Sequence, residues 1–418
     1  MPAVTVRHAA DADLAQVGAV TAHAYVADGI VDADHWYADE LRDAAARAAA
    51  ATVLVAVDPG TGRVVGTLTL AAAGSPFAEI ARDGEIELRM LAVDPGSRGA
   101  GIAEQLVVHA LREAVGRGVR DVVLSTLETM HAAHRLYARL GFVPRPERDW
   151  SDEVTMRVHA WRAPQPPGAL VEAATWPSPR TAAVDGWRVG LSGGVTRRAG
   201  STIALVDVPD VRSAVDRVEQ LYRQDGAPAV FRAGDPENPA GLAVELDRRG
   251  YTAAAVTDVL VRDLVAAPPA PGAAALAGAA VTVRVAQEPD DAWLDVWLGG
   301  KGGAREPSHA IVAGAPATYV TATDARGVDV AVIRAAPVDD WVALSCLQVV
   351  PGARRRGLGR ALTEQALALA AADGAQRAFL QVEAGNAAAL RLYGALAFRP
   401  AHRYAYRVQP LRDAGTGC

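Results

Sequence analysis

The chain has 418 residues, of which half are hydrophobic and only 5% are aromatic, and its formal net charge is −6. This length predicts two or three domains, and the acidic balance argues against nucleic-acid binding, which needs a basic surface. Two cysteines indicate neither a disulfide framework nor a metal site, and no apolar run approaches the roughly 18 residues of a membrane span. We therefore expect a soluble, cytoplasmic protein without membrane or nucleic-acid partners.

The first 162 residues alternate strand and helix patterns. Apolar patterns and turn residues predict strands at 4–7, 52–57, 64–71, 85–93, 122–126 and from 142 onward, and helices at 11–25, 38–50, 101–115 and 131–140. The predicted order is β-α-α-β-β-β-α-β-α-β, which defines an α+β domain.

The rest of the chain divides into a less regular middle part and a second complete domain. In residues 163–265 the patterns predict strands at 187–189, 201–206 and 257–264 and helices at 211–224 and 242–249. Residues 266–275 are rich in Pro and Ala, which predicts a linker. Residues 276–410 repeat the order of the first domain, and residues 411–418 form a tail. The middle part is interpreted as a shrunken copy of the same fold.

A repeat in the sequence relates the two end domains. The segment 98–103 aligns with 354–359 at an offset of 256 residues, and without a gap Tyr137 then falls on Tyr393 and Phe142 on Phe398. A Gly-rich turn and a tyrosine that keep the same spacing twice indicate two copies of one domain. The middle part has Asp207-Val208-Pro209-Asp210 where the turn is expected, so we expect no phosphate site there.

The repeated turn has the chemistry of an anion site. In each copy a strand, a proline, the pattern Arg-x-x-Gly-x-Ala/Gly and a helix follow one another. A helix N-terminus offers unpaired N–H groups and the positive end of the helix dipole, glycine lets the backbone approach a phosphate closely, and arginine adds charge-assisted hydrogen bonds. A plain strand-to-helix turn is the alternative, which the repetition disfavours.

This pattern resembles the GNAT superfamily of N-acetyltransferases, whose pyrophosphate loop reads Gln/Arg-x-x-Gly-x-Gly/Ala. The resemblance implies tandem GNAT folds with a central mixed sheet over 1–162 and 276–410, and a degenerate GNAT-like unit over 163–265. It also implies acetyl-CoA as co-substrate, no metal, and a strand that splays open before each loop. The implied cofactor-binding residues are Leu91, Ala92, Val93, Arg98, Gly99, Ala100, Gly101, Ile102 and Ala103 in the first copy, and Leu347, Gln348, Val349, Arg354, Arg355, Arg356, Gly357, Leu358, Gly359 and Asn386 in the last.

The resemblance also implies catalytic roles. Attack of an amine on a thioester needs a base for the ammonium and an acid for the departing thiolate. Tyr137 and Tyr393 match the tyrosine that the family often uses as the acid, and Glu87 lies where it often carries the base; a core tyrosine and a solvated strand carboxylate are the alternatives. Because Ala343 replaces Glu87 in the last copy, the base there is Glu383, another acid or a water chain. The sequence does not say which copy is catalytic.

A narrower resemblance covers residues 176–410, which look like an actinobacterial GNAT group associated with N-acetylglutamate synthesis. It depends on motifs such as Asp185-Gly186-Trp187-Arg188 and the segment 193–199, which ends in Arg197-Arg198-Ala199. It implies an amino-acid acceptor such as glutamate, whose carboxylates Arg197 or Arg198 would hold; surface arginines are the alternative. Gly200 departs from the Asn that is usual in the group.

We therefore expect acyl-CoA-dependent N-acetyl transfer to a small-molecule amine or amino acid. A mycothiol-synthase-like reaction, acetylation of an antibiotic, polyamine or protein, and a non-catalytic acyl-CoA sensor or scaffold are the alternatives. The oligomeric state is left open.

Overall fold

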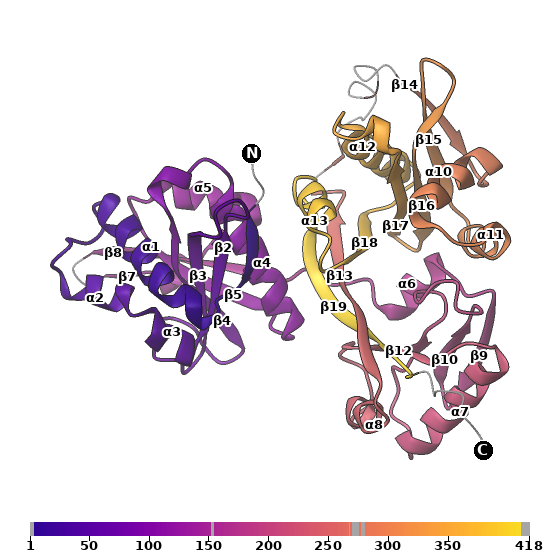
Figure 1. Cartoon of the computed structure of the whole chain (residues 1–418), viewed down its shortest axis with the longest axis horizontal. Coiled ribbons are helices and arrows are strands. Elements are labelled where there is room, and N and C mark those ends of the chain that lie inside the picture. Colours follow the sequence, from indigo (N-terminus) through magenta and orange to yellow (C-terminus); the bar gives the residue numbers. More distant parts are fainter. Residues whose placement is uncertain (1–3, 152–153, 267, 270–275, 277–280, 411–418) are drawn as a thin grey trace. The chain divides into compact units, whose positions relative to one another are not determined.

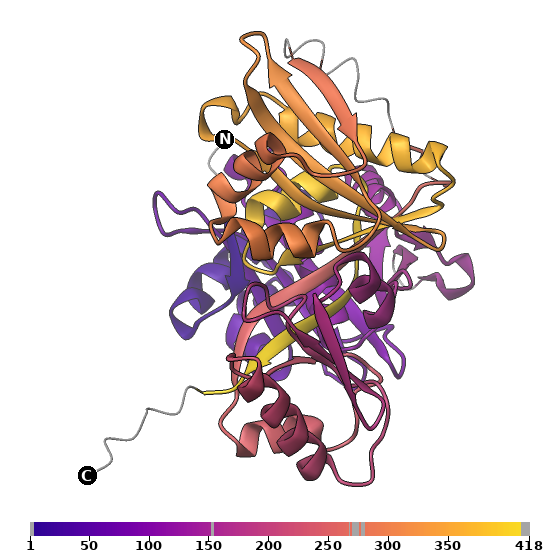
Figure 2. The same ribbon diagram turned by 90° about the vertical axis from the view of Figure 1, so that its right-hand side faces the viewer.

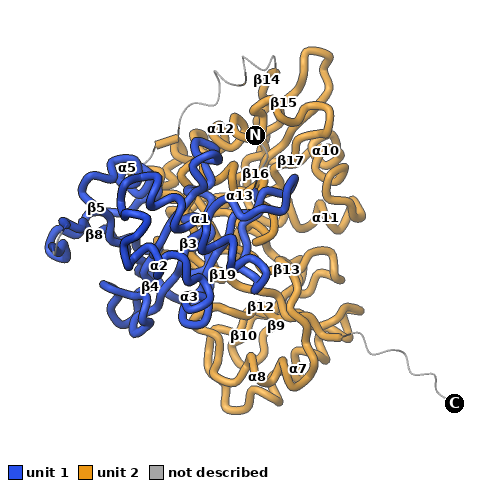
Figure 3. Tube along the Cα trace, turned by 60° about the vertical axis from the view of Figure 1, so that its left-hand side comes forward, with its two compact units in different colours: residues 1–163 blue, residues 164–418 orange. Residues whose placement is uncertain are grey.

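The computed structural model describes residues 4–151, 154–266, 268–269, 276 and 281–410. The predicted tail and most of the predicted linker lie outside the described residues. The chain forms two compact units, Met1–Ala163 and Pro164–Cys418 (Figure 3). The predicted middle part and last domain share the second unit, so their separation at residue 265 stays a prediction. None of the helices in the described ranges combines the length and the apolar character needed to cross a bilayer.

The first unit is one sheet with helices packed against it (Figure 1). Its helices are α1 (Leu14–Ala27), α2 (Trp36–Arg42), α3 (Ala44–Ala50), α4 (Ile102–Gly116) and α5 (His131–Leu140). Its strands are β1 (Thr5–His8), β2 (Thr52–Val57), β3 (Val64–Ala72), β4 (Glu85–Val93), β5 (Asp121–Leu127), β6 (Val143–Pro144), β7 (Trp150–Ser151) and β8 (Thr155–Arg162). The strands lie in the order β1-β2-β3-β4-β5-β8-β6, with β7 beside β8, and β4 runs parallel to β5.

The helix predicted at 38–50 is two helices. Asp43 separates α2 from α3 because its ψ of 71° is not helical, and its side chain instead caps α3 by accepting a hydrogen bond from Ala46 N–H. Asp is a common residue at the N-cap of a helix. The apolar spacing continues across Asp43 without a break, so the sequence pattern did not indicate that a new helix begins there.

The second unit contains one long sheet. Its helices are α6 (Ala169–Thr175), α7 (Val211–Gln224), α8 (Leu242–Arg248), α10 (Asp291–Lys301), α11 (Arg305–Val312), α12 (Leu358–Ala372) and α13 (Ala387–Gly394). Its strands are β9 (Arg180–Val184), β10 (Trp187–Leu191), β11 (Thr202–Ile203), β12 (Val230–Ala233), β13 (Thr252–Asp263), β14 (Val281–Ala286), β15 (Thr318–Asp324), β16 (Asp329–Val338), β17 (Trp341–Val349), β18 (Arg377–Glu383) and β19 (Arg399–Val408).

Two long strands, β13 and β19, are exchanged between the part of this sheet that belongs to the last domain and the part that belongs to the middle of the chain. The strand order is β14-β15-β16-β17-β18-β13-β19-β12-β11-β10-β9. Its first seven strands follow the order of the first unit, except that β13, from the middle part, stands where β8 stands there. Conversely β19, from the end of the chain, pairs with β12 of the middle part. Figures 1 and 2 show β13 and β19 side by side, running from one half of the sheet into the other.

The middle part keeps one further feature of the end domains. Its β11 is parallel to β12, and α7 lies between them in the chain, as α4 lies between the parallel pair β4 and β5. Asp210 caps α7 with its carboxylate on the N–H groups of Arg212 and Ser213. These contacts place a negative charge at the helix start, where the end domains have glycine, and they support the proposal of a degenerate copy without a phosphate site.

The backbone repeats the offset of 256 residues in detail. Met90, Gly99, Gly101 and Gly141 of the first unit have positive φ, and so do Cys346, Arg355, Gly357 and Ala397 at the equivalent positions. The two copies therefore bend at the same points. At two of them, Arg355 and Ala397, the second copy has a side chain where the first has glycine.

Replacing Ala397 with glycine should stabilise the second unit. Ala397 follows α13 at φ 60°, a conformation that costs a residue with a Cβ about 1–2 kcal/mol, part of which the greater freedom of glycine in the unfolded chain offsets. We expect Ala397→Gly to raise the free energy of unfolding by about 0.5–1 kcal/mol, measured by urea denaturation. The reverse change at the equivalent position of the first unit, Gly141→Ala, should lower the free energy of unfolding. A loss of stability in Ala397→Gly would contradict the explanation that the left-handed conformation of Ala397 is strained.

Candidate active site

Each end domain has an opening in its sheet where the family resemblance places the acyl group. The pairing of β4 with β5 covers only Glu85–Glu87, and that of β17 with β18 covers only Trp341–Leu344. Beyond these residues the strands diverge. A shift in the pairing with β3 or β16 and a positive φ at Met90 or Cys346 mark a β-bulge at the same point in both copies. On the side away from β3 or β16, the amides of 91–93 and 347–349 are thus left without a neighbouring strand, as expected.

The two predicted phosphate loops have the same backbone conformation. In each, a single turn of 3-10 helix, Pro95–Ser97 or Pro351–Ala353, leads to the arginine. Arg98 Nε donates to the Val93 carbonyl at 3.4 Å, and Arg354 Nε donates to the Val349 carbonyl at 3.0 Å. The glycine that starts each helix, Gly101 or Gly357, is left-handed. Both loops therefore present a helix N-terminus beside an arginine, the arrangement that binds phosphate.

The loops differ in what the arginine contacts. Both terminal nitrogens of Arg98 are bound to the Asp28 carboxylate, at 2.6 and 3.1 Å. In the described part of the chain, no carboxylate lies within ion-pair distance of Arg354. Asn386, which aligns with Met130, caps α13 through its side-chain oxygen and lines the cavity described below. The second unit therefore offers its loop arginine more freely to a phosphate.

Glu87, the predicted base of the first unit, is fully buried and engaged. Its Oε2 accepts hydrogen bonds from the backbone N–H groups of Glu79, Ile80 and Ala81 at 2.8, 2.8 and 3.1 Å. Its Oε1 lies 3.4 Å from Arg89, which also binds Glu79. This carboxylate organises the loop before β4. Its role as a base stays a prediction, which this geometry does not favour.

Tyr137, the predicted acid of the first unit, lies in the core. Its side chain is 7% exposed and packs against Phe142 and His159. Burial raises the pKa of the Tyr137 hydroxyl. The side chain is therefore mostly enclosed.

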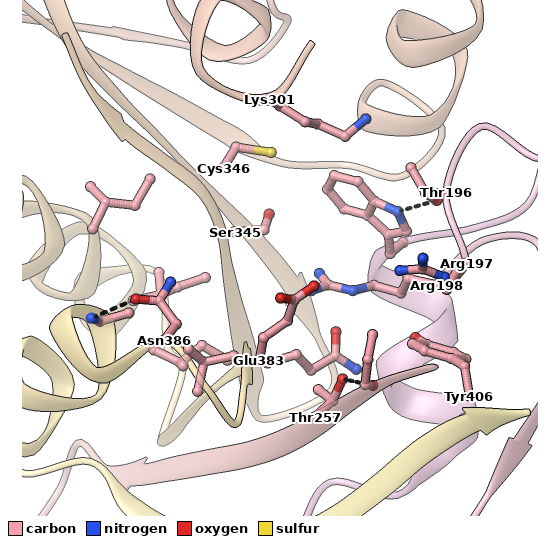
Figure 4. A pocket seen from close by; sticks show the side chains of 18 of the residues that line it. Thr196, Arg197, Arg198, Thr257, Lys301, Ser345, Cys346, Glu383, Asn386 and Tyr406 are labelled. Carbon is pink, nitrogen blue, oxygen red and sulfur yellow. Dashed lines mark hydrogen bonds between the residues drawn. The ribbon is translucent and has the colours of Figure 1, made fainter. Parts of the chain in front are cut away.

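In the second unit, one cavity of about 680 Å³ joins the predicted acyl site to the middle part of the chain (Figure 4). One wall is the bulge of β17, with Ser345, Cys346 and Leu347, next to Tyr393 and Asn386. The opposite wall is the segment 194–198 of the middle part. The ends of β18 and α10 and the strands β13 and β19 complete the lining.

The cavity is rich in positive charge. The basic residues of its lining are Arg197, Arg198 and Lys301, and the acidic residue is the predicted base Glu383. Among the described residues, neither Arg197 nor Arg198 has a carboxylate or hydrogen-bond partner. The Arg198 guanidinium instead lies 5.1 Å from the centre of the Trp176 ring. Unpaired arginines in a cavity are typical of a site that receives an anion.

The segment that carries these arginines is held rigidly. Trp176 Nε1 donates to Thr196 Oγ1 at 3.3 Å, and Gly193 N–H donates to Asp225 at 2.8 Å. Gly190 on β10 packs so closely on the returning chain that an added Cβ would lie 2.1 Å from the Ala199 carbonyl oxygen. The arginines are therefore placed in advance of any ligand, which reduces the entropy lost on binding.

Tyr393, the predicted acid of the second unit, is half-buried and lines the cavity. Its ring packs edge-on against Phe398, with centroids 5.7 Å apart. Burial raises the pKa of Tyr393 to about 12, and burial likewise raises the pKa of the Cys346 thiol to about 11. Both groups keep their protons at neutral pH, so Tyr393 can donate one.

A buried ionic network lies behind the cavity wall. Arg232, 3% exposed, binds both oxygens of Glu172 at 2.8 and 2.9 Å and also Asp235 at 2.8 Å. His402 bonds Asp235 at 3.0 Å. The Arg232 guanidinium lies 3.8 Å from the centre of the Tyr404 ring, and Tyr404 lines the cavity. Burial alone would lower the pKa of Arg232, but the surrounding negative charges hold it well above its usual value.

Several lining residues were not predicted as site residues. Trp176 directly follows α6, and Cys346, Tyr404 and Lys301 lie on β17, β19 and α10, which are separate in the sequence. One signal was available for Lys301, because it is the only lysine of the chain.

Comparison with known proteins agrees with this geometry. The GNAT acetyltransferase family matches residues 21–142. The "Uncharacterized N-acetyltransferase YobR" of Bacillus subtilis is 26% identical over 57% of this chain and 95% of its own length. The N-acetylaspartate synthetase of Xenopus tropicalis is 40% identical over 81 residues, which are 19% of this chain and 27% of that protein.

Solved structures with similar folds are also GNAT proteins. A GCN5-related N-acetyltransferase from Kribbella flavida is 19% identical over 57% of this chain and 91% of its own, with a TM-score of 0.42. The acetyltransferase yncA of Salmonella typhimurium, solved with its cofactor acetyl-CoA, is 23% identical over 38% of this chain and 94% of its own, with a TM-score of 0.30.

The fold, the two loops and the matches to the GNAT family and to YobR define an N-acetyltransferase of the GNAT superfamily. More particularly, a family described as "Probable histone acetyltransferase Rv0428c C-terminal" matches residues 170–407, more than half of the chain, and the chain belongs to this family.

Proposed function

We propose that the second unit transfers an acetyl group from acetyl-CoA to the amino group of a small molecule that carries a carboxylate, such as an amino acid. The observation that supports this most is the single cavity that contains both the opened strand β17 and the unpaired Arg197 and Arg198. An acyl group at one wall and a carboxylate at the other would place the acceptor's amine between them.

The residues of the second unit fit acetyl-CoA. The amides of 347–349, which have no neighbouring strand on the side of β18, suit the acyl carbonyl and pantetheine. The loop 354–359 suits the pyrophosphate, because Arg354 is not neutralised as Arg98 is. When bound, acetyl-CoA supplies an activated thioester carbonyl. We propose that Asn386 contacts the cofactor from the start of α13, and that the first unit, with its neutralised loop 98–103, is accessory.

The charge of the cavity favours an anionic acceptor. Three cations face one carboxylate, so a lysine-rich peptide such as a histone tail would be repelled, whereas an amino-acid carboxylate would be attracted. The partial similarity to an N-acetylaspartate synthetase supports an acidic amino acid, aspartate or glutamate, as the acceptor.

We propose Glu383 and Tyr393 as the groups that move protons. Glu383 is the carboxylate of the cavity lining and can accept the proton of the acceptor's ammonium, directly or through water. Tyr393 holds its proton and lies on the wall next to Asn386, so it can donate to the departing thiolate. Such a pair completes the chemistry without a base at Ala343.

The test is release of CoA thiol from acetyl-CoA against a panel of acceptors. Aspartate and glutamate should be turned over, while asparagine, glutamine, a polyamine and a lysine-rich peptide should react more slowly. Turnover only of the polyamine or the peptide would reject the carboxylate acceptor but keep the acetyltransferase. Binding of acetyl-CoA without turnover of any acceptor would favour the sensor.

Arg198→Ala should lower kcat/KM for the preferred carboxylate acceptor about 10- to 100-fold, because a hydrogen bond to a charged group contributes about 1.5–3 kcal/mol. The KM for acetyl-CoA should not change. Steady-state kinetics with both substrates measures this, and Arg223→Ala, an exposed arginine of α7, is the matched control. Unchanged acceptor kinetics would remove Arg198 from the acceptor site.

A further inference from the structure

Lys301 is chemically unlike every other cation of this protein. Of the 42 Lys and Arg residues in the chain, 41 are arginines, and the one lysine lines the cavity of the second unit. Arginine would serve equally at a position that needs only positive charge. Arginine, however, stays protonated in proteins and does not act as an amine, whereas lysine can lose its proton and then act as a nucleophile. A lysine retained only here therefore indicates amine chemistry at this site.

The structure places Lys301 beside the predicted acyl site. It is the last residue of α10 (Figure 4). Its Nζ lies 4.7 Å from the centre of the Trp297 ring. The preceding Gly300 packs against Gln348 of β17 so closely that an added Cβ would meet the Gln348 side chain at 2.1 Å. The end of α10 thus lies directly on the opened part of β17, where the acyl carbonyl would bind.

The surroundings of Lys301 make its proton easier to lose. In the described part of the chain no carboxylate lies within ion-pair distance of its ammonium. The other ionisable groups of the cavity are Arg197, Arg198, Glu383 and Cys346, with the hydroxyls of Tyr393, Tyr404 and Tyr406. Partial desolvation lowers the pKa of Lys301. A side chain open to the cavity and without a counter-ion can present a nucleophilic amine.

We propose that Lys301 is itself an acetyl acceptor, so that the second unit acetylates its own cavity. The neutral Nζ attacks the thioester carbonyl carbon, a nitrogen–carbon bond forms and the carbon–sulfur bond breaks. The nitrogen loses one proton and the departing thiolate gains one, which leaves Nε-acetyl-lysine and CoA thiol. The reaction uses the donor and the acyl site of the proposed function and rests on it.

Self-acetylation would change what the cavity accepts. The modified side chain is a neutral amide, so one of the three positive charges of the lining disappears. An anionic acceptor would then bind less tightly. The modification would accumulate when acetyl-CoA is abundant and the acceptor is scarce, and would slow transfer to that acceptor.

The experiment is intact-mass spectrometry of the full chain after incubation with acetyl-CoA alone, followed by peptide mapping. We expect a mass increase of one acetyl group, mapped to Lys301, and none at this position in Lys301→Arg. Peptide mapping separates Lys301 from the N-terminal amine. Arg354→Ala should slow the modification at least 10-fold, and Arg223→Ala, a change at an exposed arginine of α7, should not.

Two results would overturn the proposal. One is an unmodified Lys301 in a protein that releases CoA with small amines, which leaves the proposed function standing. The other is acetylation of Lys301 at the same rate in Arg354→Ala and in urea-unfolded protein, which would show an untemplated reaction. Failure of the proposed function itself would differ from both, because no acceptor would then release thiol from acetyl-CoA, whether or not calorimetry shows that acetyl-CoA binds.

Discussion

Tyr393→Phe is expected to lower kcat about a hundredfold, while Tyr137→Phe should leave it unchanged. General acid catalysis by a positioned side chain typically contributes 10²–10⁴-fold, so about a hundredfold is the lower end of that range. Tyr393 lines the cavity, and its pKa of about 12 keeps its proton available. Tyr137 occupies the same place in the first copy but is 7% exposed in the core. The two substitutions remove the same atom from equivalent positions.

Steady-state kinetics with acetyl-CoA and the best acceptor checks this pair, and thermal unfolding of both variants controls for folding. Because Tyr393 titrates well above neutral pH, kcat should show no loss from its ionisation up to about pH 9. A loss of rate in Tyr137→Phe instead would make the first unit the catalyst. Full rates in both variants would leave both tyrosines as packing residues.

Arg232→Met is expected to lower the free energy of unfolding of the second unit by about 3–5 kcal/mol, because it leaves the buried Glu172 without a counter-ion and the buried Asp235 with His402 alone. Glu172 and Asp235, the partners of Arg232, are 2% and 6% exposed. The same substitution removes the cation beneath Tyr404, so acceptor KM should also rise. Urea denaturation monitored by tryptophan fluorescence measures the stability.

Two further variants make this test specific. Arg217→Met breaks the exposed pair with Asp185 and should not shift the unfolding midpoint measurably. Adding Glu172→Gln and Asp235→Asn to Arg232→Met removes both stranded charges and should recover part of the loss. An Arg232→Met protein as stable as the parent would show that the carboxylates take up protons or water at little cost.

The sequence predicted the features that depend on local pattern. The offset of 256 residues related the two predicted phosphate loops and the two tyrosines to each other, and the structure shows the same offset in the left-handed positions and in the bulges of β4 and β17. The turn needs a left-handed residue at Gly101 or Gly357, so each copy of the turn can be recognised in the sequence by its glycine. The helix and strand order of the first unit follows from the same kind of local signal.

Features that depend on distant pairing could not be predicted in this way. The pattern of 257–264 indicates a strand but does not say that Val259 pairs with Gln381, nor that β19 crosses to β12. Glu87 lies on the predicted strand, yet only the fold of the loop 79–81 around its carboxylate shows how it is engaged. The cavity wall formed by Trp176 and the segment 194–198 belongs to the part of the chain with the weakest pattern.

Because β13 and β19 are exchanged, the sheet of the second unit can be completed only after β19 has been synthesised. Val230 of β12 pairs with Val408, so the middle part emerges from the ribosome long before its sheet can be completed. Until then β12 is an unprotected edge, a template for unwanted pairing. The last strand to be translated in the described chain therefore closes both halves of the sheet at once. Tyr404 and Tyr406 of β19 are part of the lining of the cavity in the second unit. A nascent chain that ends before β19 therefore cannot form this cavity completely.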